Sequence, residues 1–181
     1  MPECSIAVTT LKKGKVIAYP TEAVYGLGCD PLNEVAVHHL LSLKNRSIIK
    51  GLILIAANWA QLADYVTPLS DEVRARILPT WPGPVTWLLP ASALTPLWIK
   101  GAHDTIAIRV TAHPIAKGLC EAFGGAIVST SANVEGNPPA KTAEEVRQIF
   151  DEDVYVVTGD VGDLARPTDI RDGVTGKLVR G

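Results

Sequence analysis

The sequence of 181 residues contains only three cysteines, and no two of them are close together. Cys4, Cys29 and Cys120 are odd in number and form no Cys-x-x-Cys pair, which argues against a disulfide framework and against a zinc or redox site. No apolar run is as long as a membrane span, and the first residues lack the basic start and apolar core of a secretory signal. We therefore expect a cytoplasmic protein with no membrane segment.

The sequence also lacks the common signatures of nucleotide, metal and hydrolase sites. Gly26-x-Gly28 has neither the third glycine nor the helix start of a dinucleotide fingerprint, and there is no Gly-x-x-x-x-Gly-Lys-Ser/Thr loop. The four histidines have no partner at metal-ligand spacing, so we interpret them as surface or capping residues and expect no metal site. No Gly-x-Ser-x-Gly motif marks a nucleophilic serine, which leaves a triad of distant residues as an open alternative.

The composition favours one globular domain. Apolar side chains make up 47% of the residues and charged side chains 20%, which is enough for one sizeable core, so we expect a single domain over residues 1–181. Residues 35–120 carry eight Lys or Arg against four acidic residues, whereas residues 121–181 carry six against eleven. This asymmetry favours an anion-binding cleft about as strongly as it favours a chance difference between solvated helix faces.

Short apolar runs alternate with helical patterns along the chain. Helices are expected over 4–13, from Asn33 to about Leu43, after Asn58, from Ser70 to Pro79, from His113-Pro114 to Phe123 and after the capping box of Thr142 and Glu145. Strands are expected at 16–19, 52–55, 85–89, 105–110, 125–128 and 154–157. The alternation predicts an α/β fold. Because several links are too short for crossovers, we expect a twisted mixed parallel and antiparallel sheet flanked by helices.

Two pairs of polar residues suggest a phosphate site. Lys44 and Arg46 end a predicted helix, where the macrodipole alone would favour cations. No acidic residue is near them in the sequence, and unpaired cations beside a cleft suit phosphate. Ser131 and Asn133 follow the predicted strand at 125–128. We expect replacement of Lys44 or Arg46 by Ala to reduce activity with little effect on folding.

Two further residues are candidates by position. Arg109 is the one charged residue in an otherwise apolar predicted strand, so it must reach water, an acidic partner or a ligand, and we favour the last two. Thr21 follows the strand-ending Pro20 and could face a cleft, although a turn or cap role is the more frequent explanation for such a threonine.

Several segments occur in the order and spacing of the YrdC-like family, which the chain resembles from about residue 5 onwards. They are 19–27 (YPTEAVYGL), the Lys-x-Arg of 44–46, 81–86 (WPGPVT), 108–110 (IRV), 129–133 (STSAN) and 166–172 (RPTDIRD). Two residues depart from the family pattern, since Ser47 stands where many members have Pro and Thr168 replaces the commoner Ser. Within the family, the chain is most similar to the short-form synthases of threonylcarbamoyl-AMP.

The resemblance implies an activity and a site. The reaction would condense L-threonine, bicarbonate and ATP into threonylcarbamoyl-AMP and pyrophosphate, with Mg²⁺ carried by ATP and no dedicated protein site for the metal. The product would serve a downstream tRNA threonylcarbamoyl transferase machinery in forming threonylcarbamoyladenosine on tRNA. Carried over by position, the catalytic, nucleotide end of a basic cavity would consist of Lys44, Arg46, Ser131 and Asn133. The residues that hold threonine or its carbamate would be Thr21, Tyr25, Lys50, Arg109, Ser129 and Thr168.

Two other classes of function fit the same residues less well. The first is an RNA-binding module with a basic concave surface for tRNA or duplex RNA, acting in RNA maturation. Against it, the net charge is −2 and the pI is about 6.1, far from the strongly basic character of most nucleic-acid-binding domains. The second is a hydrolase of acylated or carbamoylated compounds, which would form product without ATP.

Overall fold

The computed structural model describes residues 2–180. The α-helices of this part of the chain are α1 (Pro2–Lys12), α2 (Glu34–Lys44), α3 (Asp71–Ile77), α4 (Leu97–Lys100), α5 (Pro114–Phe123) and α6 (Ala143–Phe150). Its 3₁₀ helices are η1 (Ile48–Lys50), η2 (Trp59–Gln61), η3 (Ala63–Tyr65), η4 (Leu78–Thr80) and η5 (Asp151–Asp153). Its strands are β1 (Ile17–Pro20), β2 (Tyr25–Gly28), β3 (Ile53–Ala56), β4 (Val85–Pro90), β5 (Thr105–Val110), β6 (Ile127–Ser131), β7 (Tyr155–Val156), β8 (Asp169–Asp172) and β9 (Leu178–Arg180).

Local capping interactions fix where the helices begin. Asn33 Oδ1 accepts a hydrogen bond from Ala36 N at 3.0 Å at the start of α2. At the start of α6 the Thr142 side chain accepts from Glu145 N, and the Glu145 carboxylate accepts from Thr142 N. Pro114 occupies the first turn of α5, where no backbone donor is needed. These predicted helix starts are confirmed.

The strands form one mixed sheet in the order β7-β1-β2-β6-β3-β5-β4-β8-β9. The pairs β1–β7, β3–β5 and β4–β8 are parallel, and the other neighbouring pairs are antiparallel. The α/β class and the mixed sheet are therefore confirmed. The four-residue link between β1 and β2 is too short for a crossover, so it forces antiparallel pairing there.

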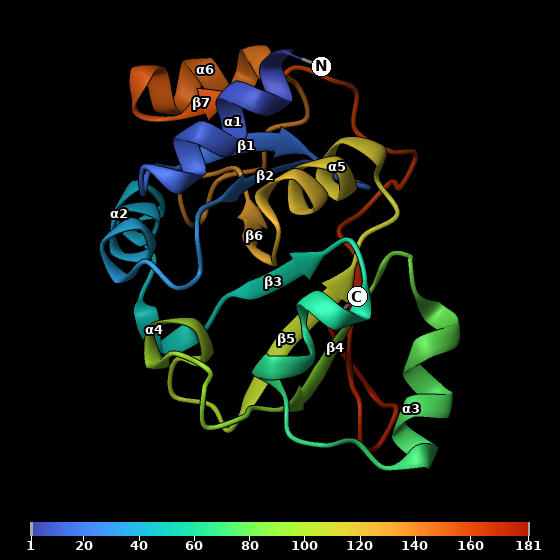
Figure 1. The fold of residues 1–181 in the computed structure, drawn as a ribbon. Helices are drawn as coiled ribbons and strands as arrows, with labels where there is room; N and C mark the ends of the chain where they lie inside the picture. The colour runs from blue at the N-terminus through green and yellow to red at the C-terminus, as the bar shows by residue number, and fades with distance from the viewer. Residues whose placement is uncertain (1, 181) are drawn as a thin grey trace.

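Helices cover the two faces of the sheet unequally (Figure 1). The apolar sides of α1 and α5 pack on one face in a small core that includes Leu11, Tyr19 and Leu119. Helices α2, α3, α4 and α6 contribute to a larger core on the other face. Because α1 and α5 do not extend over β4 and β5, part of the first face stays open. Over residues 2–180, we find no helix with both the length and the apolar character needed to cross a membrane.

Some elements differ from the sequence-based expectation. Asn58 is an N-cap as predicted, since its Oδ1 accepts from Gln61 N at 3.3 Å, but the helix that follows is the single 3₁₀ turn η2. Strands β2, β8 and β9 and the short helix α4 were not expected, because none has a clear apolar period of its own. Their conformation depends on the strands and loops beside them.

Candidate active site

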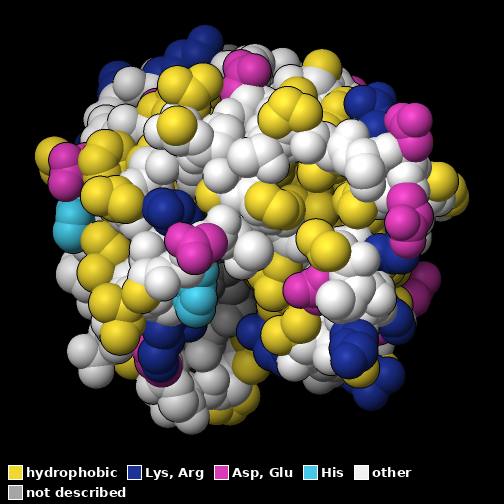
Figure 2. Space-filling view, turned by 90° about the horizontal axis from the view of Figure 1, so that it is seen from below, with side chains coloured by type: hydrophobic (Ala, Val, Ile, Leu, Met, Phe, Trp, Pro, Cys, Tyr) yellow, Lys and Arg dark blue, Asp and Glu magenta, His cyan; other side chains and the backbone are white. Residues whose placement is uncertain are grey.

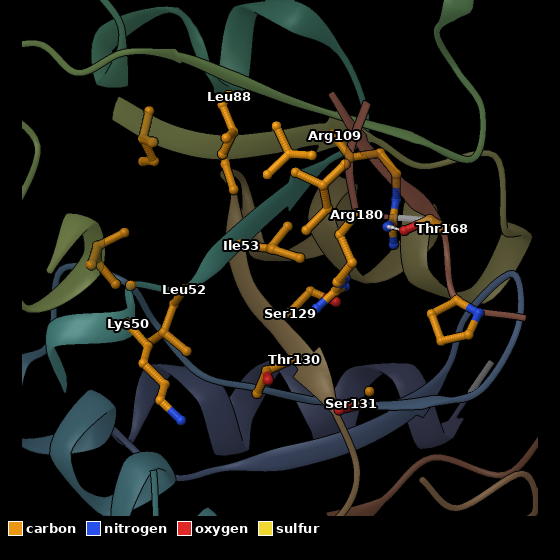
Figure 3. A pocket seen from close by; sticks show the side chains of 18 of the residues that line it. Lys50, Leu52, Ile53, Leu88, Arg109, Ser129, Thr130, Ser131, Thr168 and Arg180 are labelled. Atoms are coloured by element: carbon orange, nitrogen blue, oxygen red, sulfur yellow. Dashed lines mark hydrogen bonds between the residues drawn. The ribbon is translucent and has the colours of Figure 1, made fainter. Parts of the chain in front are cut away.

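A cavity of about 590 Å³ lies on the open part of the sheet, beside the small core (Figure 3). Its floor is a row of side chains that lie next to one another in register on adjacent strands. They are Ser129 in β6, Ile53 in β3, Ala107 in β5 and Leu88 in β4. Ile53 both packs against the small core and lines the cavity, so the two lie next to each other on the same face. The remaining walls come from loops and from the C-terminal strands.

One end of the cavity is cationic. Arg46 and Lys50, which follow α2, both line it. Arg46 Nη2 donates to Gly51 O at 3.1 Å, whereas Arg46 Nε is buried without a hydrogen-bond partner. Lys50 Nζ pairs with the carboxylate of Glu135. Burial lowers the pKa of Arg46 below its ordinary value, and the Arg180 charge acts in the same direction against the opposing effect of Glu135. This end of the cavity is therefore suited to an anion.

Lys44 does not have the position that the sequence suggested. It is only 2% exposed and is not among the residues that line the cavity. Its ammonium donates to Ser131 O at 2.5 Å, to Asn133 O at 2.9 Å and to Asn133 Oδ1 at 3.3 Å. Burial, followed by the nearby Arg46 charge, lowers the pKa of Lys44 to about 8. The interpretation of Lys44 as a free cation beside a cleft is wrong, because carbonyl groups distant in sequence occupy all three of its donors.

Ser131 and Asn133 lie together, as their shared segment suggested, but only Ser131 lines the cavity. Ser131 lines the cavity and donates its hydroxyl proton to Asn133 Oδ1 at 2.6 Å. Asn133 lies behind the wall, where its Nδ2 donates to Val134 O at 3.1 Å and to Asn137 O at 2.8 Å. The structure thus brings Lys44, Ser131 and Asn133 into one hydrogen-bonded group, with only the Ser131 side facing the cavity.

Arg109 lies at the other end of the cavity, with an acidic partner (Figure 3). Its Nη2 donates to Glu22 Oε2 at 3.2 Å, which confirms the predicted acid partner. Its Nη1 donates to Thr168 Oγ1 at 2.8 Å and to Thr86 Oγ1 at 3.3 Å. Burial alone would raise the pKa of Glu22. The Arg109 charge and the hydrogen bond from Thr111 outweigh it, so the pKa of Glu22 lies below its ordinary value.

The other predicted substrate residues line the same cavity with different chemistry. Thr21 is buried and donates its hydroxyl proton to Val24 O at 2.7 Å, so towards a ligand it offers only an acceptor. Ser129 lies on the floor. The Tyr25 hydroxyl is occupied elsewhere, because it donates to Gly159 O at 2.6 Å and accepts from Gly159 N at 3.1 Å. Thr21 therefore both stabilises the turn between β1 and β2 and lines the cavity.

Sequence reasoning missed three parts of this site. Glu22 has no local signal for its role, since its partner Arg109 is 87 positions away. Arg180 in β9 lines the cavity, and in Figure 3 it projects between Lys50 and the Arg109 end. The third part is residues 158–165 of a segment that we call the strap, residues 158–168, which crosses the link between β1 and β2 and ends at the predicted Thr168. A pattern search for apolar periodicity detects none of these features.

The histidines follow the expectation only in part. His38, His39 and His103 are exposed, and His113 is the N-cap residue of α5 as expected, although it is buried and its side chain makes no capping hydrogen bond. Its Nε2 donates to Asp160 O of the strap at 3.0 Å, and its Nδ1 has no partner. Over residues 2–180, no three side chains of His, Cys, Asp or Glu come together in a group that could hold a metal ion.

Comparison with known proteins adds a family to this geometry. The family model described as "Telomere recombination", Sua5/YciO/YrdC, matches residues 9–180. The threonylcarbamoyl-AMP synthase of Coxiella burnetii (strain RSA 493 / Nine Mile phase I) is 53% identical over 175 residues, which are 96% of this chain and 94% of that protein.

Two solved structures have the same fold. P. abyssi Sua5 complexed with L-threonine superposes with a TM-score of 0.91 at 33% identity, covering 98% of this chain and 53% of that chain. E. coli YciO superposes with a TM-score of 0.85 at 26% identity, covering 98% and 87%. This chain thus spans about half the length of the Sua5 chain. Since the family model covers nearly all of the described residues and the Coxiella relative matches along almost its whole length, the chain belongs to the Sua5/YciO/YrdC family.

Proposed function

We propose that the protein is a nucleotidyltransferase that condenses L-threonine, bicarbonate and ATP into threonylcarbamoyl-AMP, with release of pyrophosphate and water. The observation that carries this proposal is one cavity with Arg46 and Lys50 at one end and Arg109 with Thr168 at the other. The name of the Coxiella relative and the L-threonine bound in P. abyssi Sua5 support the same reaction.

The cationic end is suited to the nucleotide. In this reaction an oxygen of the threonine carbamate attacks the α-phosphorus of ATP, and the bond to pyrophosphate breaks. Negative charge then builds on the phosphate oxygens, so preorganised cations stabilise the transition state. Arg46, Lys50 and Arg180 line the cavity and supply that charge, and Mg²⁺ would arrive with ATP. Ser131 is placed to contact the same phosphates, whereas Lys44 and Asn133 hold Ser131 in position.

The Arg109 end is suited to the amino acid. A guanidinium held in a fixed plane recognises a carboxylate well, since its N–H groups form a fork. Thr21 offers an acceptor for the ammonium or hydroxyl group of threonine, because its own proton is already donated to Val24 O. We assign threonine to the end formed by Thr21, Arg109 and Thr168, with Ser129 on the floor between the two substrates.

The test is pyrophosphate release by the purified protein with ATP, Mg²⁺, bicarbonate and one amino acid at a time. We expect release that requires both threonine and bicarbonate. If no amino acid stimulates release with bicarbonate present, the synthase proposal fails. Product formed without ATP would indicate a hydrolase instead.

A matched pair of variants tests the cationic end. Arg46→Ala should lose about 2 to 5 kcal/mol of transition-state stabilisation, as expected for truncation of a partly buried charge that contacts phosphate. Arg74→Ala is the control, because Arg74 is an exposed residue of α3. Equal rates for the two variants would show that Arg46 does not contact the nucleotide.

The proposal extends to partners and location. The unstable product would pass to a tRNA threonylcarbamoyl transferase machinery in the cytoplasm, and the continuous sheet from β7 to β9 supports treating the chain as one domain. An RNA-binding module is the less favoured function. The net charge is −2, and on the face seen in Figure 2 acidic and basic side chains are interspersed rather than gathered into one basic surface.

A further inference from the structure

Glu22 is a buried carboxylate that lies directly behind the cavity wall. The residue is 8% exposed and is not among those that line the cavity, whereas its partner Arg109 does line it. Burial of a carboxylate costs free energy unless the group is paired with a cation and hydrogen-bonded. The pairing of Glu22 is therefore informative about its role.

Both oxygens of this carboxylate are held from β5 and the residues that follow it. Oε2 accepts from Arg109 Nη2 at 3.2 Å. Oε1 accepts from Thr111 Oγ1 at 2.7 Å and from Ala112 N at 3.1 Å. These three donors fix the position of the carboxylate from two directions, so it in turn can fix the Arg109 side chain.

The backbone of Glu22 also carries the strap. Its carbonyl accepts from Leu164 N at 3.2 Å, and the neighbouring Thr21 carbonyl accepts from Gly162 N at 2.9 Å. The strap approaches so closely that a Cβ on Gly162 would lie 2.6 Å from Glu22 O. The strap ends at Thr168, whose Oγ1 accepts a hydrogen bond from Arg109 Nη1. Glu22 thus contacts both elements that determine where the Arg109 guanidinium points.

Fixing a guanidinium in advance matters for binding. Arg109 has five N–H groups, and Glu22, Thr86 and Thr168 engage three of these, which sets the plane of the fork before a ligand arrives. A ligand carboxylate then binds without the cost of ordering the arginine. Without Glu22, Arg109 would keep only two hydroxyl partners and would be free to turn.

We propose that Glu22 is a positioning residue for amino-acid binding, holding Arg109 and the strap so that the cavity accepts the carboxylate of an α-amino acid. This inference rests on the proposed function. It adds a residue that does not contact the substrate itself. Glu22 instead sets the affinity of the Arg109 end of the cavity for the amino acid.

The test compares L-threonine with L-threoninol, which lacks the carboxylate, by calorimetric titration of wild type and Glu22→Gln. For Glu22→Gln we expect the Kd for threonine to rise on the order of 10- to 100-fold, while the Kd for ATP stays within about twofold. The affinity ratio of threonine to threoninol should shrink by a similar factor. The matched control is Glu72→Gln, because Glu72 pairs with Arg76 on the exposed side of α3 and should leave every constant unchanged.

Each outcome decides between defined alternatives. If wild type binds threonine and Glu22→Gln binds it equally well, the inference is wrong while the proposed function stands. An equal loss for threonine and threoninol would also overturn it, since that pattern indicates general damage to the cavity. Wild type that binds no threonine would refute the proposed function and this inference together.

If Glu22→Gln does not fold, Glu22→Asp is the variant to test, because it keeps the negative charge but shortens the side chain by one methylene. We expect an intermediate, carboxylate-specific loss, and an unchanged ratio would overturn the inference.

Discussion

At the scale of single residues, Lys44 shows how a cation can serve a site without lying in it. Its ammonium is the shared donor for Ser131 O, Asn133 O and Asn133 Oδ1. Lys44→Met should lower the free energy of unfolding by about 2 to 4 kcal/mol at pH 7, because buried acceptors are left without a donor. This reverses our expectation that replacing Lys44 would leave folding almost unchanged. Urea unfolding measures the effect, and the exposed Lys13→Met is the control, expected to change stability by less than about 0.5 kcal/mol.

The same lysine predicts a pH dependence of stability. Its pKa is lowered to about 8 in the folded protein from its ordinary 10.5. Between these two values the unfolded chain binds more protons than the folded one, so the contribution of Lys44 to stability rises with pH across this window. The stability of wild type minus that of Lys44→Met should therefore increase from pH 8 to pH 10, by at most about 3 kcal/mol. A difference that is flat or falls over this range would contradict the lowered pKa.

At the scale of elements, the strap packs closely against the backbone of Glu22. Gly162→Ala would place a Cβ 2.6 Å from Glu22 O and 3.0 Å from Glu22 Cα, so the strap must move away. We expect a loss of about 1 to 3 kcal/mol in stability and a weaker affinity for threonine, measured by thermal unfolding and titration. The control is Gly118→Ala in α5, where nothing lies within 4 Å of the added Cβ and the helix should gain about 0.5 to 1 kcal/mol. If Gly162→Ala lowers neither the stability nor the affinity for threonine, the close contact between Gly162 and Glu22 does not restrict the strap.

The elements also show what a sequence can predict and why. The starts of α2 and α6 were predictable because Asn33, Thr142 and Glu145 act on backbone groups within three residues of themselves. Strand β2 was not, because Tyr25–Gly28 contains two glycines and becomes a strand through pairing with β1 and β6. The motifs contain many of the polar residues that line the cavity, among them Thr21, Arg109 and Thr168. Glu22 and the burial of Lys44 depend on partners more than eighty positions away, which no local pattern records.

At the scale of the whole molecule, the cavity joins parts of the chain that are far apart in sequence. Thr21, Arg46, Arg109 and Thr168 come from four separate segments, so a ligand that contacts them binds the folded state alone. Threonine at about 100 times its Kd should raise the free energy of unfolding by about 2.7 kcal/mol. L-valine, which has a similar shape without the hydroxyl, should stabilise far less at the same concentration. Denaturant curves with each amino acid measure both effects, and equal stabilisation by valine would show that the hydroxyl is not recognised.

The position of the strap, β8 and β9 at one wall of the cavity has a consequence for synthesis. Thr168, Ile170 and Arg180 all line the cavity, and all leave the ribosome after the strands that form its floor. A nascent chain that ends before residue 167 has made most of the sheet but lacks this wall, and Arg109 lacks its Thr168 partner. We expect such a chain to bind substrate more weakly, so the activity we propose should begin only once these strands have been translated. Threonine present at that moment would then favour their docking over the partly built cavity.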